Sequence, residues 1–259
     1  MPDSPTTPPV RPIVLARTPL APGASHGAVA PCLEMLGGSR LIERLLTTLE
    51  GAGLSSPVVV APHDSVPALR RVLGDRAQVL ASDGDRRASL SVALAATTDD
   101  LLLIHDAERA LTPATVVTEV LAALGAGIDA VVPVVAMTDS VKGVDHDGLH
   151  NIDRSSVAAM QSPRLLRRAT LERALARPEA RVAGEAERPG HSDGVGAGAG
   201  SAEPYDEILA ALADGAEVRT VHGSHAGFAV VDRLSLWRAQ IALGLARDTS
   251  QHHGLARRS

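Results

Sequence analysis

Short apolar segments alternate with amphipathic segments along most of the chain. Residues 40–50 carry leucine at every fourth position from Leu41 to Leu49, which predicts an amphipathic helix that ends near Gly51. Residues 58–60 are three consecutive valines between two prolines, which indicates a strand buried on both faces. The same patterns predict further strands at 13–15, 79–80, 101–104, 130–135, 218–221 and 228–231, and further helices at 65–73, 89–96, 112–124, 163–175, 205–212 and 232–243.

Buried strands that alternate with helices are typical of βαβ units, so the pattern predicts a doubly wound α/β fold with a mostly parallel sheet. In such sheets ligands bind beyond the carboxyl ends of the strands. Residues that directly follow a strand are therefore site candidates. Asp106 follows the strand at 101–104, and Asp139 follows the strand at 130–135.

Composition divides the chain into one domain with several appended segments. Between 137 and 160, turn-forming residues interrupt the apolar pattern, which predicts a projecting arm. Between 178 and 204, Gly, Ala, Glu, Ser and Pro dominate with almost no large apolar residue, which predicts disorder. The predicted organisation is a disordered leader at 1–10, a single α/β domain at 11–246 that contains the arm and the disordered insert, and a flexible tail at 247–259.

Charge and composition narrow the possible partners and the compartment. The 259 residues carry a formal net charge of -5, so the chain lacks the basic surface that nucleic acids require. Tyr205, Phe228 and Trp237 are the only aromatic residues, which disfavours base stacking, and no apolar run is long enough to span a membrane. The single cysteine, Cys32, excludes an internal disulfide, and the start of the chain has no secretory signal pattern. We therefore expect a cytoplasmic protein that binds neither nucleic acid nor membrane.

The segment 105–109 is the most informative candidate for chemistry. It places a carboxylate, Asp106, three residues before a guanidinium, Arg109, at the end of a strand. Such a pair can hold a divalent cation and a phosphate together. The alternative is that Asp106 caps the next turn and pairs with Arg109, and spacing alone leaves both open. The glycine-rich run at 196–200 follows no strand and is better explained by low complexity.

Six stretches, in this order, resemble the 2-C-methyl-D-erythritol 4-phosphate cytidylyltransferase family. The resemblance implies a Rossmann-like sheet of the nucleotide-diphospho-sugar transferase type and a homodimer built through the β-arm. It also implies CMP transfer from CTP to a sugar-alcohol phosphate with Mg²⁺, a step of non-mevalonate isoprenoid biosynthesis. The six stretches are 84–89, 105–109, 139–142, 152–154, 160–163 and 228–230.

The resemblance also implies two sets of site residues but assigns no catalytic residue. One set lies beside the cytosine nucleotide and consists of Gly84, Arg86 and Ser89. The other holds the sugar-alcohol phosphate and consists of Asp106, which is also the metal ligand, Arg109, Ser140 and Arg154, the last reaching across the dimer. Ser140 stands where the family usually has threonine, and it keeps the hydroxyl.

The chain departs from the family at two lysine positions. Cys32, or Pro31 beside it, stands where the family has one lysine, and Ala229 stands where it has the other. Arg17 is the only arginine between 15 and 32. Three hypotheses follow: an active enzyme in which Arg17 or another arginine replaces the lysines, an inactive homologue that binds a ligand or a dimer partner, and a nucleotidyltransferase for another sugar phosphate.

Overall fold

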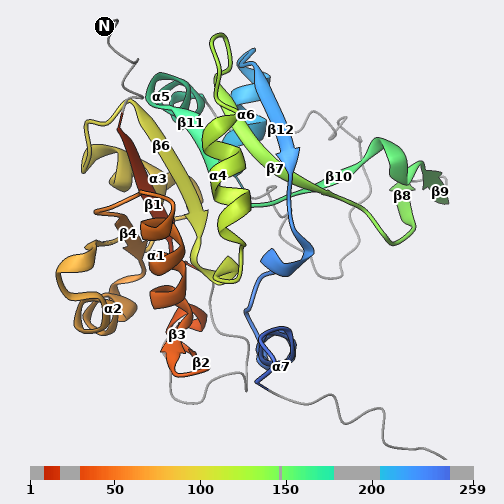
Figure 1. The fold of residues 1–259 in the computed structure, drawn as a ribbon. Coiled ribbons are helices and arrows are strands. Elements are labelled where there is room, and N and C mark those ends of the chain that lie inside the picture. Colours follow the sequence, from red (N-terminus) through yellow and green to blue (C-terminus); the bar gives the residue numbers. More distant parts are fainter. Residues whose placement is uncertain (1–8, 18–29, 146–147, 178–204, 246–259) are drawn as a thin grey trace, which may run out of the picture.

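A central mixed β-sheet organises the residues that the computed structural model describes, which are 9–17, 30–145, 148–177 and 205–245 (Figure 1). Within these residues the sheet has eight strands in the order β5-β4-β1-β6-β11-β7, with β10 and β12 also paired to β7. The strands are β1 (Val10–Leu15), β4 (Val58–Ala61), β5 (Gln78–Ala81), β6 (Leu101–Asp106), β7 (Ala130–Ala136), β10 (Ala158–Met160), β11 (Arg164–Arg167) and β12 (Val218–His222).

Helices cover both faces of the sheet, which confirms the doubly wound α/β prediction. Core residues of α1 (Leu41–Gly51), α2 (Val66–Leu73) and α4 (Ala114–Ala122) pack on one face, and α7 (Arg233–Ala242) adds core residues to the same cluster. Those of α3 (Arg86–Ala95), α5 (Arg168–Ala176) and α6 (Glu207–Ala213) pack on the other. Strands β5, β4, β1 and β6 are mutually parallel, so their carboxyl ends share one edge of the sheet.

Strand β1 lies at the centre of this parallel part, paired with β4 and β6. Ile13 is fully buried in β1, and we expect Ile13→Val to lower the free energy of unfolding by about 1 kcal/mol because one buried methylene is lost. Chemical denaturation measures this change. Leu234→Ala is the matched control, since Leu234 is 64% exposed and should change stability by less than about 0.5 kcal/mol. Equal effects of the two substitutions would contradict the assigned core.

Two predicted elements are wrong. Residues 163–175 were predicted as one helix, but 164–167 form β11, which runs antiparallel to both β6 and β7, and α5 begins only at Arg168. The adjacent Leu165 and Leu166 are buried in the two opposite layers of the core, as a strand requires. Residues 228–231 form no strand, because Val230 makes a single backbone contact there, to the carbonyl oxygen of Glu108 at 2.8 Å.

The predicted arm region contains a hairpin that is separate from the central sheet. Strands β8 (Val141–Asp145) and β9 (Gly148–Ile152) pair antiparallel, and Figure 1 shows them projecting to one side. A short strand pair near α1 consists of β2 (Met35–Leu36) and β3 (Ser39–Arg40). The predicted insert at 178–204, the tail at 247–259 and most of the predicted leader lie outside the described residues. In the part of the chain that the structure describes, none of the helices has the length and apolar character needed to cross a membrane.

Candidate functional site

A pocket of about 420 Å³ opens at the carboxyl ends of β1 and β6. Leu15 and Asp106 are paired in register at these two strand ends, and both line the pocket. The position agrees with the rule that ligands bind at this edge of a parallel sheet. The remaining described lining residues come from the loop after β1, the start of α3, the short turn η4 (Ala107–Arg109) and the segment before α7, and they are Arg17, Asp85, Arg86, Glu108, Arg109, Ala229 and Val231.

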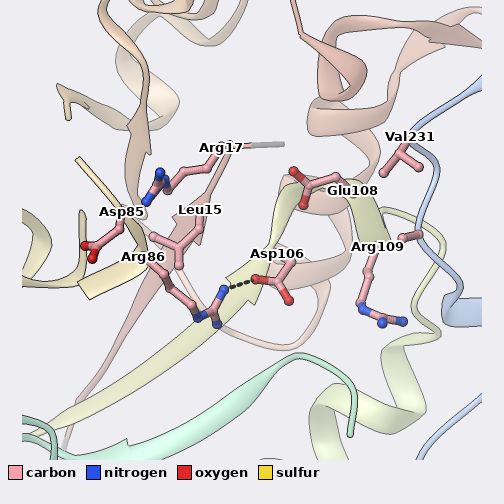
Figure 2. A pocket seen from close by; sticks show the side chains of 9 residues that line it. Leu15, Arg17, Asp85, Arg86, Asp106, Glu108, Arg109 and Val231 are labelled. Atoms are coloured by element: carbon pink, nitrogen blue, oxygen red, sulfur yellow. Dashed lines mark hydrogen bonds and ion pairs between the residues drawn. The ribbon is translucent and has the colours of Figure 1, made fainter. Parts of the chain in front are cut away.

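Arg86 and Asp106 form an ion pair in the wall of the pocket (Figure 2). Nη1 of Arg86 donates to Oδ1 of Asp106 at 2.7 Å. Burial alone would raise the pKa of Asp106, but the charge and hydrogen bond of Arg86 lower it below its usual value. The other side of the Arg86 guanidinium is bound by Glu207, through Nε and Nη2 at 2.7 Å each. Arg86 is therefore held by two carboxylates at once.

Arg17 is a pocket cation with two buried N–H groups that are not hydrogen bonded to any described residue. Its Nε and Nη1 atoms are buried and donate no hydrogen bond within the described part of the chain. In Figure 2 its guanidinium lies on the same side of the pocket as Asp85 and Arg86, whereas Arg109 lies on the opposite side. Burial lowers the pKa of Arg17, although its usual value is high enough that the side chain stays charged near neutral pH. A half-buried guanidinium with two N–H groups that donate to no described residue favours an anionic ligand.

His105 and Arg109 lie close to Asp106 in sequence, at the carboxyl end of β6 and in the turn that follows it. Nη1 of Arg109 donates to the carbonyl oxygen of Gly227 at 2.7 Å, which places the guanidinium against the segment before α7. His105 is fully buried behind the pocket, and burial lowers its pKa to about 4. Its imidazole is therefore neutral at pH 7. The alternative in which Asp106 pairs with Arg109 and caps the turn is not what the structure shows, because Asp106 pairs with Arg86 and makes no side-chain cap.

The charges that line the described pocket balance. Arg17, Arg86 and Arg109 supply three positive charges, and Asp85, Asp106 and Glu108 supply three negative ones. Carboxylate oxygens are the ligands that magnesium prefers, and Mg²⁺ commonly binds through one or two carboxylates together with substrate phosphates. Among the described residues no group of three or more acidic, histidine or cysteine side chains is placed to hold a metal by itself. The donor set therefore fits a metal ion that is shared with a phosphate ligand.

Only part of the predicted nucleotide set reaches the pocket. Arg86 lines it, but Ser89 is fully buried inside α3, where its hydroxyl donates to Oγ of Ser82 at 3.0 Å. Gly84 lies just before α3, where an added Cβ would come within 2.5 Å of Cβ of Ala88. Gly84 therefore allows the loop to pack closely on the first turn of the helix, and its role there is backbone packing.

The two predicted arm residues, Ser140 and Arg154, are exposed and do not line the pocket of this chain. Nη1 of Arg154 donates to the carbonyl oxygen of Thr138 at 3.2 Å, which holds the side chain against the base of the arm. Of the residues predicted to hold the sugar-alcohol phosphate, Asp106 and Arg109 are thus the two that lie together in the pocket of a single chain.

Cys32 and Ala229, the two residues that were predicted to stand at lysine positions of the family, carry no positive charge. Cys32 lies in the short helix η1 (Pro31–Leu33) and is 2% exposed, and Ala229 lines the pocket with a methyl group. Burial, with a contribution from the charge of Glu108, raises the pKa of Cys32 to about 12. The thiol is therefore neutral at any pH near 7 and supplies neither a cation nor a nucleophile.

We expect Cys32 to be unreactive in the native protein. A thiol reagent added at pH 8 should label almost no protein, because the thiolate is both rare and buried. In urea above the unfolding midpoint, the same reagent should label one thiol per chain, since Cys32 is the only cysteine. With a reagent that releases a chromophore when it reacts, the absorbance measures the extent of labelling in the folded and in the unfolded protein. Rapid labelling of the folded protein would contradict the buried position.

Sequence reasoning missed the buried acid Glu207 and its second arginine partner, Arg164. Nη1 of Arg164 donates to Oε1 of Glu207 at 2.9 Å and to Oδ2 of Asp206 at 2.8 Å. Arg86 and Glu207 are 121 positions apart, and no spacing rule relates them. The one available signal was the adjacency of Asp206 and Glu207 at the start of a predicted helix, where acidic side chains are usually explained as caps.

Solved structures with the same architecture show the class of protein to which this fold belongs. A 4-diphosphocytidyl-2C-methyl-D-erythritol synthase from Anaerococcus prevotii superposes with a TM-score of 0.69 at 18% identity, over 92% of this chain and 99% of that one. The 2-C-methyl-D-erythritol 4-phosphate cytidylyltransferase from Thermus thermophilus superposes with a TM-score of 0.64 at 23% identity, over 90% and 98%. The chain has the α/β fold of these cytidylyl-transferring synthases.

Sequence similarity then gives the family. Residues 29–245 match the family model described as IspD, 2-C-methyl-D-erythritol 4-phosphate cytidylyltransferase. Proteins of that name from Frankia casuarinae and Rhodococcus jostii are 37% identical over 165 residues and 36% identical over 143 residues. These matches cover 62% and 52% of this chain, and 62% and 63% of the two relatives. The chain belongs to the 2-C-methyl-D-erythritol 4-phosphate cytidylyltransferase family, which confirms the resemblance seen in its motifs.

Proposed function

We propose that the pocket binds CTP and 2-C-methyl-D-erythritol 4-phosphate and transfers CMP from the first to the second. The curated relatives carry the name of this activity, and the aligned region spans less than two thirds of their length. The observation that carries the proposal is the guanidinium of Arg17, whose Nε and Nη1 atoms have no hydrogen-bond partner among the described residues and which lines the pocket with Asp106 and Arg86. In this proposal Arg17 supplies the positive charge that Cys32 and Ala229 do not, although it does so from a different position.

The proposed reaction is an in-line displacement at phosphorus. A phosphate oxygen of the acceptor forms a bond to the α-phosphorus of CTP. The bond between the α-phosphorus and the oxygen that bridges it to the β-phosphorus breaks, and pyrophosphate leaves with that electron pair. Negative charge accumulates on the phosphate oxygens, so the residues contribute by positioning and by positive charge. Arg17 would bind the triphosphate and Arg109 the acceptor phosphate. A divalent metal, when bound, neutralises phosphate oxygens, and Asp106 is the carboxylate that would hold it.

The other predicted residues keep supporting roles in this proposal. Gly84 and Ser89 shape the nucleotide side from within the loop and α3, since neither lines the pocket. Ser140 and Arg154 would bind the acceptor phosphate of a second subunit, because both are exposed on the arm. We also propose that the protein acts in the cytoplasm, since its single cysteine is consistent with a reducing compartment.

We propose that the arm forms a homodimer contact. Val144 in β8 and Leu149 in β9 are directly opposite each other in the hairpin and are 78% and 74% exposed. A directly opposed pair of large apolar side chains gains free energy when a second chain covers it. Analytical ultracentrifugation of the full chain tests this, with a Val144→Asp and Leu149→Asp double variant expected to sediment as a monomer.

A second candidate function is a homologue that binds its ligand without turnover. Three observations favour it: the neutral thiol of Cys32, the methyl group of Ala229, and the balanced charge of the described pocket. Loss of one preorganised charge commonly lowers a rate by about 10² to 10³. Such a protein would retain ligand binding or pairing with an active partner.

Calorimetric titration with CTP in the presence of Mg²⁺ separates the candidates when it is combined with a turnover assay. Micromolar CTP binding together with pyrophosphate release supports the transferase. CTP binding with no release, with the acceptor present, supports the inactive homologue. A folded protein that binds neither CTP nor the acceptor phosphate contradicts both. GTP, which differs in the base, is the matched control for binding by the triphosphate alone.

A further inference from the structure

Glu207 is a buried carboxylate that does not line the pocket but is bound to a residue that does. It is the first residue of α6 and its side chain is completely buried. Arg86 binds it in a bidentate manner, with Nε donating to Oε2 and Nη2 to Oε1, both at 2.7 Å. Arg164 adds a third contact to Oε1 at 2.9 Å. Every oxygen of the carboxylate is therefore engaged by an arginine.

Arg86 connects this buried acid to the pocket. The planar guanidinium offers its remaining edge, Nη1, to Oδ1 of Asp106 at 2.7 Å (Figure 2). Because the guanidinium is rigid and planar, fixing Nε and Nη2 on Glu207 also fixes where Nη1 points. The orientation of the Asp106 carboxylate is thus set by a residue on the far side of Arg86.

Asp106 has little else to hold its side chain. Its backbone nitrogen donates to Oγ of Ser162 at 3.1 Å, which fixes the main chain only. Among the described residues, Oδ2 of Asp106 accepts no hydrogen bond, and the residue lines the pocket beside Arg109. A free carboxylate oxygen next to a guanidinium is suited to a ligand that carries hydroxyl donors and a phosphate, which is the chemistry of a sugar-alcohol phosphate.

We propose that Glu207 is a positioning residue that orients Asp106 toward the hydroxyls of the acceptor by acting through Arg86. This inference rests on the proposed function for the identity of the acceptor. Glu207 itself touches no reactant. Its loss should therefore weaken acceptor binding without a comparable change in the use of CTP.

The first test is steady-state kinetics of Glu207→Gln in the full chain. We expect the KM for 2-C-methyl-D-erythritol 4-phosphate to rise about tenfold and the KM for CTP to rise less, because Asp106 is on the acceptor side whereas Arg86 keeps its place in α3. Glu207→Asp, which keeps the charge, should recover part of the loss. Glu50→Gln is the matched control, since Glu50 makes the same bidentate contact with Arg76 on the surface. Equal changes in both KM values would overturn the inference.

A double-mutant cycle tests whether Glu207 acts through Arg86. When Arg86→Lys has already broken the bidentate contact, adding Glu207→Gln should change the KM for the acceptor by less than about twofold. Effects that multiply would mean that the two residues act independently, and the inference would be wrong. Circular dichroism confirms that each variant is folded, and Glu207→Asp carries the test if Glu207→Gln does not fold.

Failure of the proposed function remains distinguishable from failure of this inference. If the wild-type protein releases no pyrophosphate, the proposed transfer is wrong. The affinity for 2-C-methyl-D-erythritol 4-phosphate, measured by calorimetry, then tests the positioning role alone. A Kd that rises about tenfold in Glu207→Gln but not in Glu50→Gln supports it. A Kd that does not change in Glu207→Gln, or wild-type protein that does not bind this ligand, overturns it.

Discussion

Substitution of Arg17 by alanine is expected to lower the rate of pyrophosphate release by about 10² to 10³, because it removes a pocket cation whose Nε and Nη1 atoms have no hydrogen-bond partner among the described residues. Arg86 cannot replace it, since three of its N–H groups are already bound to Asp106 and Glu207. Arg17→Lys keeps the charge and should retain more activity than Arg17→Ala. Continuous measurement of pyrophosphate under saturating substrates gives the rates.

The same substitution should leave the fold intact, and this distinguishes a role in function from one in stability. The buried Nε and Nη1 atoms of Arg17 have no partner, so removing them relieves a desolvation cost, and the melting temperature should stay the same or rise. Arg71→Ala, at an exposed position of α2, is the control and should change neither property. Full activity in Arg17→Ala would show that the account of the triphosphate side is wrong.

Arg86→Met is expected to lower the free energy of unfolding by about 3–5 kcal/mol. The substitution leaves the fully buried carboxylate of Glu207 with Arg164 alone and leaves Asp106 with no ion pair to Arg86. Chemical denaturation followed by circular dichroism measures the loss. The effect is large because a buried charge that has lost its partner cannot recover its hydration.

The double variant Arg86→Met and Glu207→Met should be more stable than Arg86→Met alone, because removal of both partners leaves no isolated buried charge. Arg164 then still pairs with Asp206 at 2.8 Å. Arg76→Met provides a surface comparison, since Arg76 forms an exposed bidentate pair with Glu50, and it should cost no more than about 1 kcal/mol. A double variant that is less stable than the single one would contradict this view of the buried network.

Much of the fold could be predicted because each helix or strand shows its own period. Leucines at every fourth position marked α1, and the three valines of β4 marked a strand buried on both faces. One exception was β11, where Leu165 and Leu166 are adjacent and precede a true helix. The pattern of a four-residue strand between β6 and β7 cannot be distinguished from the start of that helix, because its burial is decided by strands that are distant in sequence.

The candidate site could be predicted only where a motif and a strand end coincide. Asp106 and Arg109 satisfy both conditions, and they line the pocket. Ser89 matched a motif, but the sequence could not show that its hydroxyl faces Ser82 inside the protein. Glu207 could not be found at all, because its role depends on a contact with Arg86 that forms only when α3 and α6 pack on the same face of the sheet.

Incubation of the purified full chain with CTP, 2-C-methyl-D-erythritol 4-phosphate and Mg²⁺, followed by phosphorus NMR, tests the central claim most directly. We expect pyrophosphate signals and the two coupled signals of a cytidine diphosphate ester to appear together, and omission of the acceptor to abolish both. A folded protein that leaves the CTP signals unchanged with both substrates and metal present would contradict the claim that this pocket transfers CMP.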